Sequence, residues 1–187
     1  MKLNGILLLM LVLSTMTEAQ VITDFSSEEE QRLWRITNDS VMGGRSISQF
    51  DVVDTVGVFS GSVSLQNNGG FASVFRPVFT NKQTADARVV IKIKGDGKWY
   101  QLRFRTNRNA YGLAYQVPFK TASSQWQTLE FKLTDFSATY RGYRVNNAPQ
   151  LSLSLITSVG FLIAKKQVGN FNLQIGSIEV IADENFI

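Results

Sequence analysis

From Ser46 onward the chain is divided into short runs of alternating apolar and polar residues, separated by Gly, Asn and Asp. The runs cover residues 59–65, 71–76, 88–94, 98–106, 111–119, 126–133, 158–165 and 171–181. Alternation with a period of two places successive side chains on opposite faces of a strand, and many short strands at regular spacing are typical of a β-sandwich or barrel. A chain of 187 residues fits one such domain.

One strand pairing is predicted in detail. Asp96-Gly97 lies between two alternating runs and is a strong signal for a two-residue hairpin turn. That turn pairs residues whose numbers sum to 193, and it places one set of apolar side chains on the core face: Val89, Ile91, Ile93, Tyr100, Leu102 and Phe104. The opposite face of the hairpin then carries Lys92, Lys94, Trp99, Gln101, Arg103 and Arg105.

The last apolar run changes phase in its middle. Phe171, Leu173 and Ile175 alternate with polar residues, but Ile178 and Val180 are out of phase with them. A β-bulge at Gly176 would absorb the extra residue.

The segment before the strands predicts one short helical turn, from Ser27 to Arg32. Ser27 and Glu30 have the spacing of a capping box, in which each side chain bonds the backbone of the other residue. In this interpretation Glu28 to Glu30 form a solvated start of the helix.

The composition excludes several kinds of chemistry. The chain contains no Cys and no His, so it has no thiol nucleophile, no histidine general base and no zinc site made from those residues. Glycoside hydrolysis by two carboxylates needs a pair about 5–10 Å apart in one cleft, and no such pair is evident among the acidic residues. We expect no enzyme activity, no catalytic residue, no metal and no cofactor.

The N-terminal segment has the pattern of a secretory signal peptide. Lys2 supplies a positive charge, an apolar run follows from Gly5 to Leu13, and Thr17-Glu18-Ala19 resembles a cleavage site. This pattern predicts a signal peptide over residues 1–19, a mature domain over 20–187 without a transmembrane segment, and a periplasmic or extracellular location.

A set of motifs resembles the complex I intermediate-associated protein 30 family. They are Trp34; Asn38-Asp39-Ser40-Val41-Met42-Gly43-Gly44-Arg45-Ser46; Phe59-Ser60-Gly61; Asn67-Asn68-Gly69-Gly70-Phe71-Ala72-Ser73; Gly95-Asp96-Gly97-Lys98-Trp99-Tyr100; Trp126; Arg141-Gly142; and Gly169-Asn170-Phe171. The resemblance implies a galactose-binding-like jelly roll, similar to many carbohydrate-binding modules, and in mitochondrial members a role in assembling respiratory complex I. Together with the alternation, it predicts a single antiparallel jelly-roll β-sandwich from about Ile22 to Ile181.

Two of these motifs have two interpretations. Asn and Asp beside paired glycines form tight turns, because their side chains bond nearby backbone and Gly accepts positive φ. The same oxygens could instead line a ligand or cation loop, although hard cations need 6–8 oxygen ligands. We favour a structural role for these residues: Asn38, Asp39, Met42, Gly43, Gly44, Asn67, Asn68, Gly69 and Gly70.

The predicted ligand-binding residues are Trp99, Gln101, Arg103 and Arg105. The opposite side chains of this strand belong to the core, so these four have no packing role in a two-layer sandwich. Arg can form bidentate hydrogen bonds to oxygen ligands, and an aromatic ring can stack on a sugar or a cation. The alternative is a solvated sheet face on which Lys94 simply covers Trp99.

Two functions of different class remain open. One is a non-catalytic module that assists complex assembly through protein contact, and the other is an exported carbohydrate-binding module that recognises a glycan. Nucleic acid is not an expected partner, because the net charge is only +4 and the basic residues are dispersed.

Overall fold

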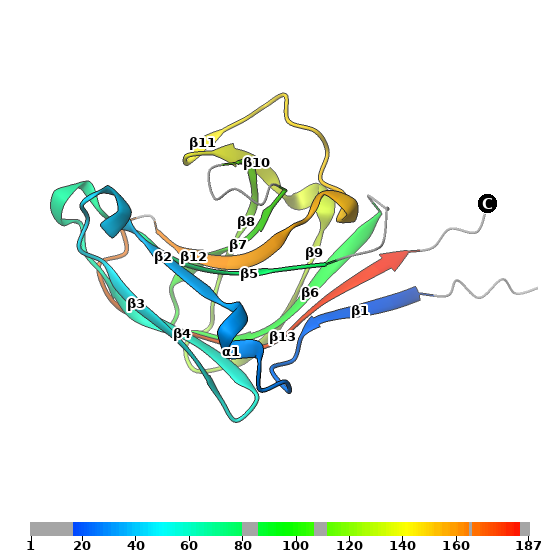
Figure 1. Cartoon of the computed structure of the whole chain (residues 1–187), viewed down its shortest axis with the longest axis horizontal. Helices are drawn as coiled ribbons and strands as arrows, with labels where there is room; N and C mark the ends of the chain where they lie inside the picture. Colours follow the sequence, from blue (N-terminus) through cyan, green and yellow to red (C-terminus); the bar gives the residue numbers. More distant parts are fainter. Residues whose placement is uncertain (1–16, 80–85, 107–111, 165, 184–187) are drawn as a thin grey trace, which may run out of the picture.

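The computed structural model describes residues 17–79, 86–106, 112–164 and 166–183. Within these ranges the chain is a sandwich of two antiparallel sheets (Figure 1), which confirms the predicted jelly roll. The elements, in chain order and with 3₁₀-helices labelled η, are β1 (Thr17–Thr23), α1 (Glu30–Leu33), β2 (Arg35–Asn38), η1 (Asp39–Met42), β3 (Ile47–Val53), β4 (Val56–Val63), η2 (Gln66–Asn68), β5 (Ala72–Pro77), β6 (Ala87–Lys94), β7 (Trp99–Arg105), β8 (Ala114–Lys120), β9 (Trp126–Lys132), η3 (Leu133–Asp135), β10 (Ser137–Tyr140), β11 (Tyr143–Arg144), η4 (Leu153–Leu155), β12 (Ser158–Ile163) and β13 (Gly169–Asp183). No helix among the described residues is long and apolar enough to cross a bilayer.

The described strands divide into a six-stranded and a seven-stranded sheet. The first has the order β3-β4-β13-β6-β9, with β1 also paired to β13, and the second has the order β11-β10-β8-β7-β12-β5-β2. The prediction missed β1, β2, β3, β10 and β11. β1 pairs Ala19 with Ile181 and Gln20 with Val180, so it runs across the predicted boundary between 1–19 and 20–187, and that boundary stays a prediction.

The core lies between the two sheets. Val89, Ile91 and Ile93 of β6 enter it from one side, and Leu102 and Phe104 of β7 enter it from the other; none of these five side chains is exposed. Burying one large aliphatic or aromatic side chain contributes about 1.5–3 kcal/mol. The predicted core face of both strands is confirmed.

The predicted hairpin is wrong. β6 pairs with β13 and β9, whereas β7 pairs with β8 and β12, so the Asp96-Gly97 loop carries the chain from one sheet to the other. Asp96 holds this loop by accepting hydrogen bonds from the Lys98 amide (3.1 Å) and the Tyr100 hydroxyl (3.1 Å). Lys94 therefore lies beside Trp126, 5.6 Å from the ring centre, and does not cover Trp99.

The predicted bulge in the last strand is confirmed. The register of β13 against β6 shifts between Ile175 and Ser177, on either side of Gly176. Because of this shift, both Ile175 and Ile178 point into the core and are fully buried.

The helical turn is confirmed, but its capping box and solvated start are wrong. Glu30 turns inward and is only 6% exposed. Its carboxylate accepts hydrogen bonds from Nη1 of Arg76 at 2.7 and 2.9 Å and from the indole N–H of Trp34 at 3.3 Å. Nη1 of Arg76 also donates to the carbonyl of Ile22 at 2.7 Å. This buried pair ties α1 to β5.

Candidate functional site on the outer face of the seven-stranded sheet

The four predicted ligand-binding residues all lie on the outer face of the seven-stranded sheet. β7 runs through the middle of this sheet, and its inward side chains are fully buried. The structure does not gather the four into one cluster, because six residues of extended strand separate Trp99 from Arg105 by about 20 Å. They form two groups, an arginine pair (Arg103 and Arg105) and an exposed Trp99 with Gln101 beside it.

Arg103 is a partly buried cation whose hydrogen bonds are incomplete. One of its terminal nitrogens donates to the hydroxyl of Thr139 at 3.1 Å, and that hydroxyl donates in turn to the carbonyl of Ala114 at 3.0 Å. Its Nε is inaccessible to solvent and has no hydrogen-bond partner. Burial, followed by the charge of Arg105, lowers the pKa of Arg103 to about 10.

Arg105 is held against an aromatic ring. Its guanidinium carbon lies 3.5 Å from the centre of the Phe75 ring, a cation–π contact. Phe75 lies on the outer face, yet it is only 5% exposed. Burial also lowers the pKa of Arg105.

The arginine pair has no acidic partner in the described part of the chain. The ion pairs within that part join other residues: Arg76 with Glu30, Arg88 with Glu130, and Lys98 with Asp96. Two neighbouring guanidinium groups that no described carboxylate neutralises suit an anionic oxygen ligand.

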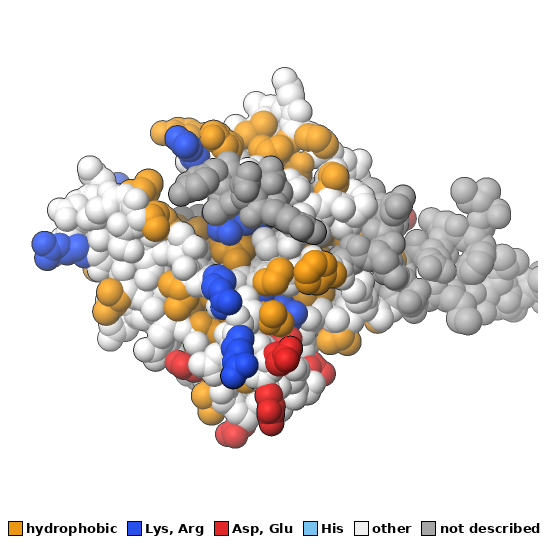
Figure 2. Space-filling model, viewed as in Figure 1, with side chains coloured by type: hydrophobic (Ala, Val, Ile, Leu, Met, Phe, Trp, Pro, Cys, Tyr) orange, Lys and Arg blue, Asp and Glu red, His pale blue; other side chains and the backbone are white. Residues whose placement is uncertain are grey.

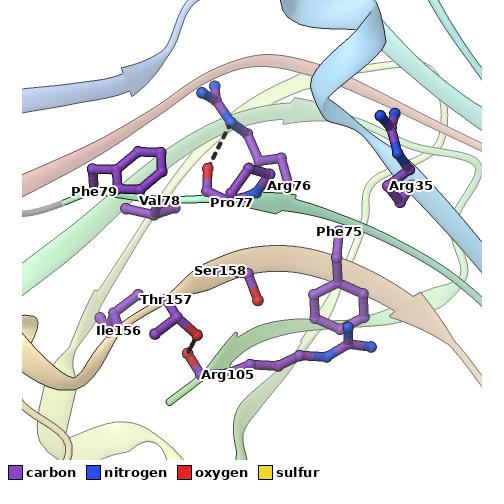
Figure 3. Close-up of a pocket in the computed structure, with 10 residues that line it drawn as sticks. All are labelled: Arg35, Phe75, Arg76, Pro77, Val78, Phe79, Arg105, Ile156, Thr157 and Ser158. Carbon is purple, nitrogen blue, oxygen red and sulfur yellow. Dashed lines mark hydrogen bonds between the residues drawn. The ribbon is translucent and has the colours of Figure 1, made fainter. Parts of the chain in front are cut away.

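An open cavity of about 580 Å³ lies against Arg105 of this pair (Figure 3). Its lining comes from β2, β5, the end of β7 and the start of β12: Arg35, Phe75, Arg76, Pro77, Val78, Phe79, Arg105, Ile156, Thr157 and Ser158. Arg35 projects beside the cavity, and its Nη1 donates to the backbone carbonyls of Arg32 and Trp34. The lining therefore combines guanidinium groups with apolar rings and holds no carboxylate.

Trp99 and Gln101 occupy the other end of β7. Trp99 is 42% exposed, and its backbone is fixed by Gln167, which accepts from the Trp99 amide at 2.9 Å and donates to its carbonyl at 2.8 Å. Residues 99 and 101 are opposed on β8 by Lys120 and Pro118. An exposed indole beside an amide side chain can stack on a ligand and hydrogen-bond it.

Sequence reasoning missed the residues that complete the arginine pair, namely Phe75 and Thr139, and also Arg35 beside it. They come from β5, β10 and β2, which are distant from β7 in the sequence. No local pattern connects them, because only the strand order brings them together.

The two motif loops meet at Asp39, which is fully buried. Its carboxylate accepts hydrogen bonds from the amides of Ser46 (2.9 Å), Gly70 (2.6 Å) and Phe71 (3.2 Å), and from the Ser46 hydroxyl. Burial alone would raise the pKa of Asp39, but these hydrogen bonds outweigh it and lower the pKa. A Cβ atom at Gly44 or Gly69 would overlap the carboxylate, so both positions require glycine.

The remaining motif residues join the loops to each other or face solvent. The Asn67 amide donates to the carbonyl of Gly43 at 3.0 Å, and the Asn38 side chain accepts from the Ser48 hydroxyl at 2.7 Å. Gly43 has a positive φ of 87°, and Met42 is 68% exposed. Both carboxylate oxygens of Asp39 therefore accept hydrogen bonds from donors of the protein itself.

Comparison with known sequences gives one family and several relatives. The family model described as "Complex I intermediate-associated protein 30 (CIA30)" matches residues 23–175. A Caenorhabditis elegans protein named "Probable complex I intermediate-associated protein 30, mitochondrial" is 24% identical over 91% of this chain and 56% of its own length. The Mus musculus protein of similar name is 23% identical, over 90% of this chain and 58% of its own length. The chain thus spans little more than half the length of these relatives.

Solved structures show the same fold in carbohydrate-binding proteins. A family 11 carbohydrate-binding module from Clostridium thermocellum, in complex with a mixed-linked tetrasaccharide, superimposes with a TM-score of 0.61 at 15% identity, over 90% of this chain and 98% of the module. The agarase AgWH50C superimposes with a TM-score of 0.59 at 12% identity, over 90% of this chain and 25% of the agarase. At such low identity the likeness concerns the fold alone.

The predicted export of the chain is wrong. The relatives in Caenorhabditis elegans, Caenorhabditis briggsae and Mus musculus are all mitochondrial proteins. The export prediction depended on Lys2, the apolar run from Gly5 to Leu13 and the Thr17-Glu18-Ala19 pattern. A positive charge, an apolar run and small residues do not by themselves specify the compartment.

Proposed function

Since the chain belongs to the complex I intermediate-associated protein 30 family, we propose that it is a non-catalytic factor that assists the assembly of respiratory complex I by binding a protein partner. The relatives from Caenorhabditis elegans and Mus musculus carry that family name. Their names agree with the family model, and this agreement supports complex I as the complex that is assembled. The geometry of the candidate site supports partner binding as the way in which the chain acts.

The observation that carries the proposed mode of action is the arginine pair beside the cavity. Arg103 and Arg105 are held in place by Thr139 and Phe75, yet no carboxylate of the described chain neutralises them. A partner that brings Asp or Glu side chains, or a C-terminal carboxylate, would complete their hydrogen bonds. The cavity lining contains no carboxylate, His or Cys, and the hydroxyls of Thr157 and Ser158 have no general base beside them among the lining residues. This lining supports binding as the activity of the surface.

The test is affinity capture of mitochondrial partners with the tagged full chain. We expect complex I subunits to copurify with the wild-type chain and to be lost with Arg103→Met/Arg105→Met. Arg88→Met is the matched control, because Arg88 lies on β6 of the other sheet, paired with an exposed Glu130. Failure of the wild-type chain to retain any complex I subunit would contradict the proposal.

A glycan is the second candidate, and the exposed Trp99 favours it. An aromatic ring that is 42% exposed on an open sheet face can stack on the apolar face of a sugar. A titration of the intrinsic fluorescence with soluble oligosaccharides tests this candidate, with Trp99→Ala as the variant that must lose the signal and Trp126→Ala as the one that keeps it.

A further inference from the structure

Three connections lie together at one end of the sandwich, and we call their described residues the loop end: residues 39–46, 64–71, 164 and 166–169. The first two are joined by the hydrogen bond from Asn67 to the carbonyl of Gly43. The third joins them through Gly169, which pairs with Val63 at the end of β4. Figure 1 shows the connections after β2 and β4 side by side at the left of the molecule.

Large aliphatic side chains project from all three connections into solvent. Val41 is 67% exposed, Met42 68%, Leu65 41% and Val168 58%. Ile47, at the first position of β3 beside them, is 69% exposed. Exposed apolar side chains gathered at one end of a domain mark an interaction surface.

The hydrogen bonds of the buried Asp39 fix the backbone of the loop from which Val41 and Met42 project. Val41 and Met42 lie in η1, whose first residue is the fully buried Asp39 with its four donors. The loops therefore do not need Val41 or Met42 for packing, and their aliphatic side chains remain available to a partner.

The charge of the loop end is positive. Its described residues include the cations Arg45 and Lys166, and their one acidic residue is the buried Asp39. Arg45 and Lys166 are exposed. Acidic side chains gather elsewhere, at the lower end of the view in Figure 2, and the left-hand end of that view shows none.

We propose that the loop end binds the surface of an anionic lipid bilayer, with the aliphatic side chains inserted among the lipids and Arg45 and Lys166 at the headgroups. Apolar side chains combined with cations are the signature of peripheral membrane binding. None of the five apolar residues is aromatic, and they are spread over η1, the first residue of β3 and the connections before η2 and β13. The centres of protein interfaces are instead enriched in aromatic residues. A fluid bilayer accepts scattered aliphatic side chains without a complementary shape. This inference does not depend on the proposed function.

The absence of cysteine from the chain allows a direct test with a fluorophore at one position. Met42→Cys and Val53→Cys are each labelled with an environment-sensitive dye; Val53 is also exposed, at 54%, but lies at the far end of β3. The full chain is mixed with vesicles of phosphatidylcholine alone or of phosphatidylcholine with phosphatidylglycerol. We expect a blue shift and protection from an aqueous quencher at position 42 only, and only with the anionic vesicles.

This design separates the loop end from the apolar N-terminal run, which could bind vesicles by itself. If the chain sediments with vesicles while the dye at position 42 stays exposed to quencher, the proposal is overturned. If no vesicle binds the chain, it is overturned as well.

Substitutions give the second arm of the test. In vesicle sedimentation, Val41→Ser/Met42→Ser should weaken binding at least about tenfold, because two apolar side chains no longer insert. Arg45→Gln/Lys166→Asn should weaken it and reduce its dependence on salt; Asn tolerates the positive φ of 56° at position 166. The matched control, Val53→Ser/Tyr143→Ser, alters exposed apolar residues elsewhere and should bind as the wild type does. Equal binding of all these variants to the vesicles would contradict the proposal. It would also be contradicted if the loop-end substitutions abolished binding to a protein partner while the wild-type chain bound no vesicles.

Discussion

Two charged side chains, the fully buried Asp39 and the partly buried Arg103, differ in how many of their hydrogen bonds the protein completes. Asp39 is fully buried and accepts hydrogen bonds from three backbone amides and one hydroxyl. Arg103 has an inaccessible Nε without a partner, one bond to Thr139, and a second cation, Arg105, nearby. A buried charge contributes to stability only when its hydrogen bonds are complete.

The difference separates a residue that serves the fold, Asp39, from a residue that we propose binds a partner, Arg103. Asp39 joins two loops that lie about thirty residues apart in the sequence, so the fold depends on it. Removing the guanidinium group of Arg103 from water costs free energy, and its incomplete hydrogen bonds do not fully offset that cost. The charge of Arg103 therefore adds little to the stability of the fold. The comparison predicts a large loss of stability for Asp39 variants and a small change for Arg103 variants.

The largest effect is expected for Asp39→Asn. The amide group cannot accept from all four donors and presents its own N–H groups to them, so the variant should lose about 3–5 kcal/mol of unfolding free energy. Urea denaturation measures the loss. Asp54→Asn is the control, because Asp54 is exposed in a turn with a positive φ that Asn tolerates, and it should change stability by less than about 0.5 kcal/mol. Equal stability of the two variants would remove the distinction between the two charged side chains.

Leu102→Ala sharpens the comparison on β7 itself. Leu102 is fully buried and points away from its neighbour Arg103, so truncation should cost about 2–5 kcal/mol through lost burial and a cavity. Val90→Ala, at a half-buried position on the outer face of β6, should cost less. A silent Leu102→Ala in urea denaturation would mean that the inner and outer faces of β7 have been exchanged.

The pH dependence of stability tests the state of Asp39. The pKa of its carboxyl is lowered in the folded protein, so its contribution is fully present above the unfolded pKa of about 3.9 and is lost as the pH falls through the lower folded pKa. The difference in unfolding free energy between the wild type and Asp39→Asn should be constant above about pH 5. Below pH 4 it should narrow by up to about 1.4 kcal/mol per pH unit. A difference that stays constant down to pH 2 would show that the fold does not lower the pKa of Asp39.

The sequence predicted those parts of the fold that local alternation determines. Burial of Ile91 and Leu102, the bulge at Gly176 and the sandwich itself follow from apolar spacing. The pairing of β6 with β7 was predicted wrongly, because an Asp-Gly turn between two inward-facing strands has the same local pattern whether the strands share a sheet or face each other across the core. The hydrogen bond that Asp96 accepts from the amide of Asn172, 3.0 Å away, is long-range and leaves no local signal.

The same limit applies to the candidate site. The outward direction of Arg103 and Arg105 could be read from their alternation with Leu102 and Phe104. Their environment could not, because Phe75 and Thr139 reach them through the strand order of the sheet. The inward turn of Glu30 was also hidden, since its partner Arg76 lies 46 residues away.

The most direct measurement is the unfolding free energy of Arg103→Met in urea, beside the wild type. Methionine retains much of the apolar contact of the arginine stem and removes the charge. We expect a change of less than about 1 kcal/mol in either direction, because the fold does not complete the hydrogen bonds of Arg103. A loss of more than about 2 kcal/mol would show that Arg103 serves the fold as Asp39 does, and would contradict its assignment to a binding site.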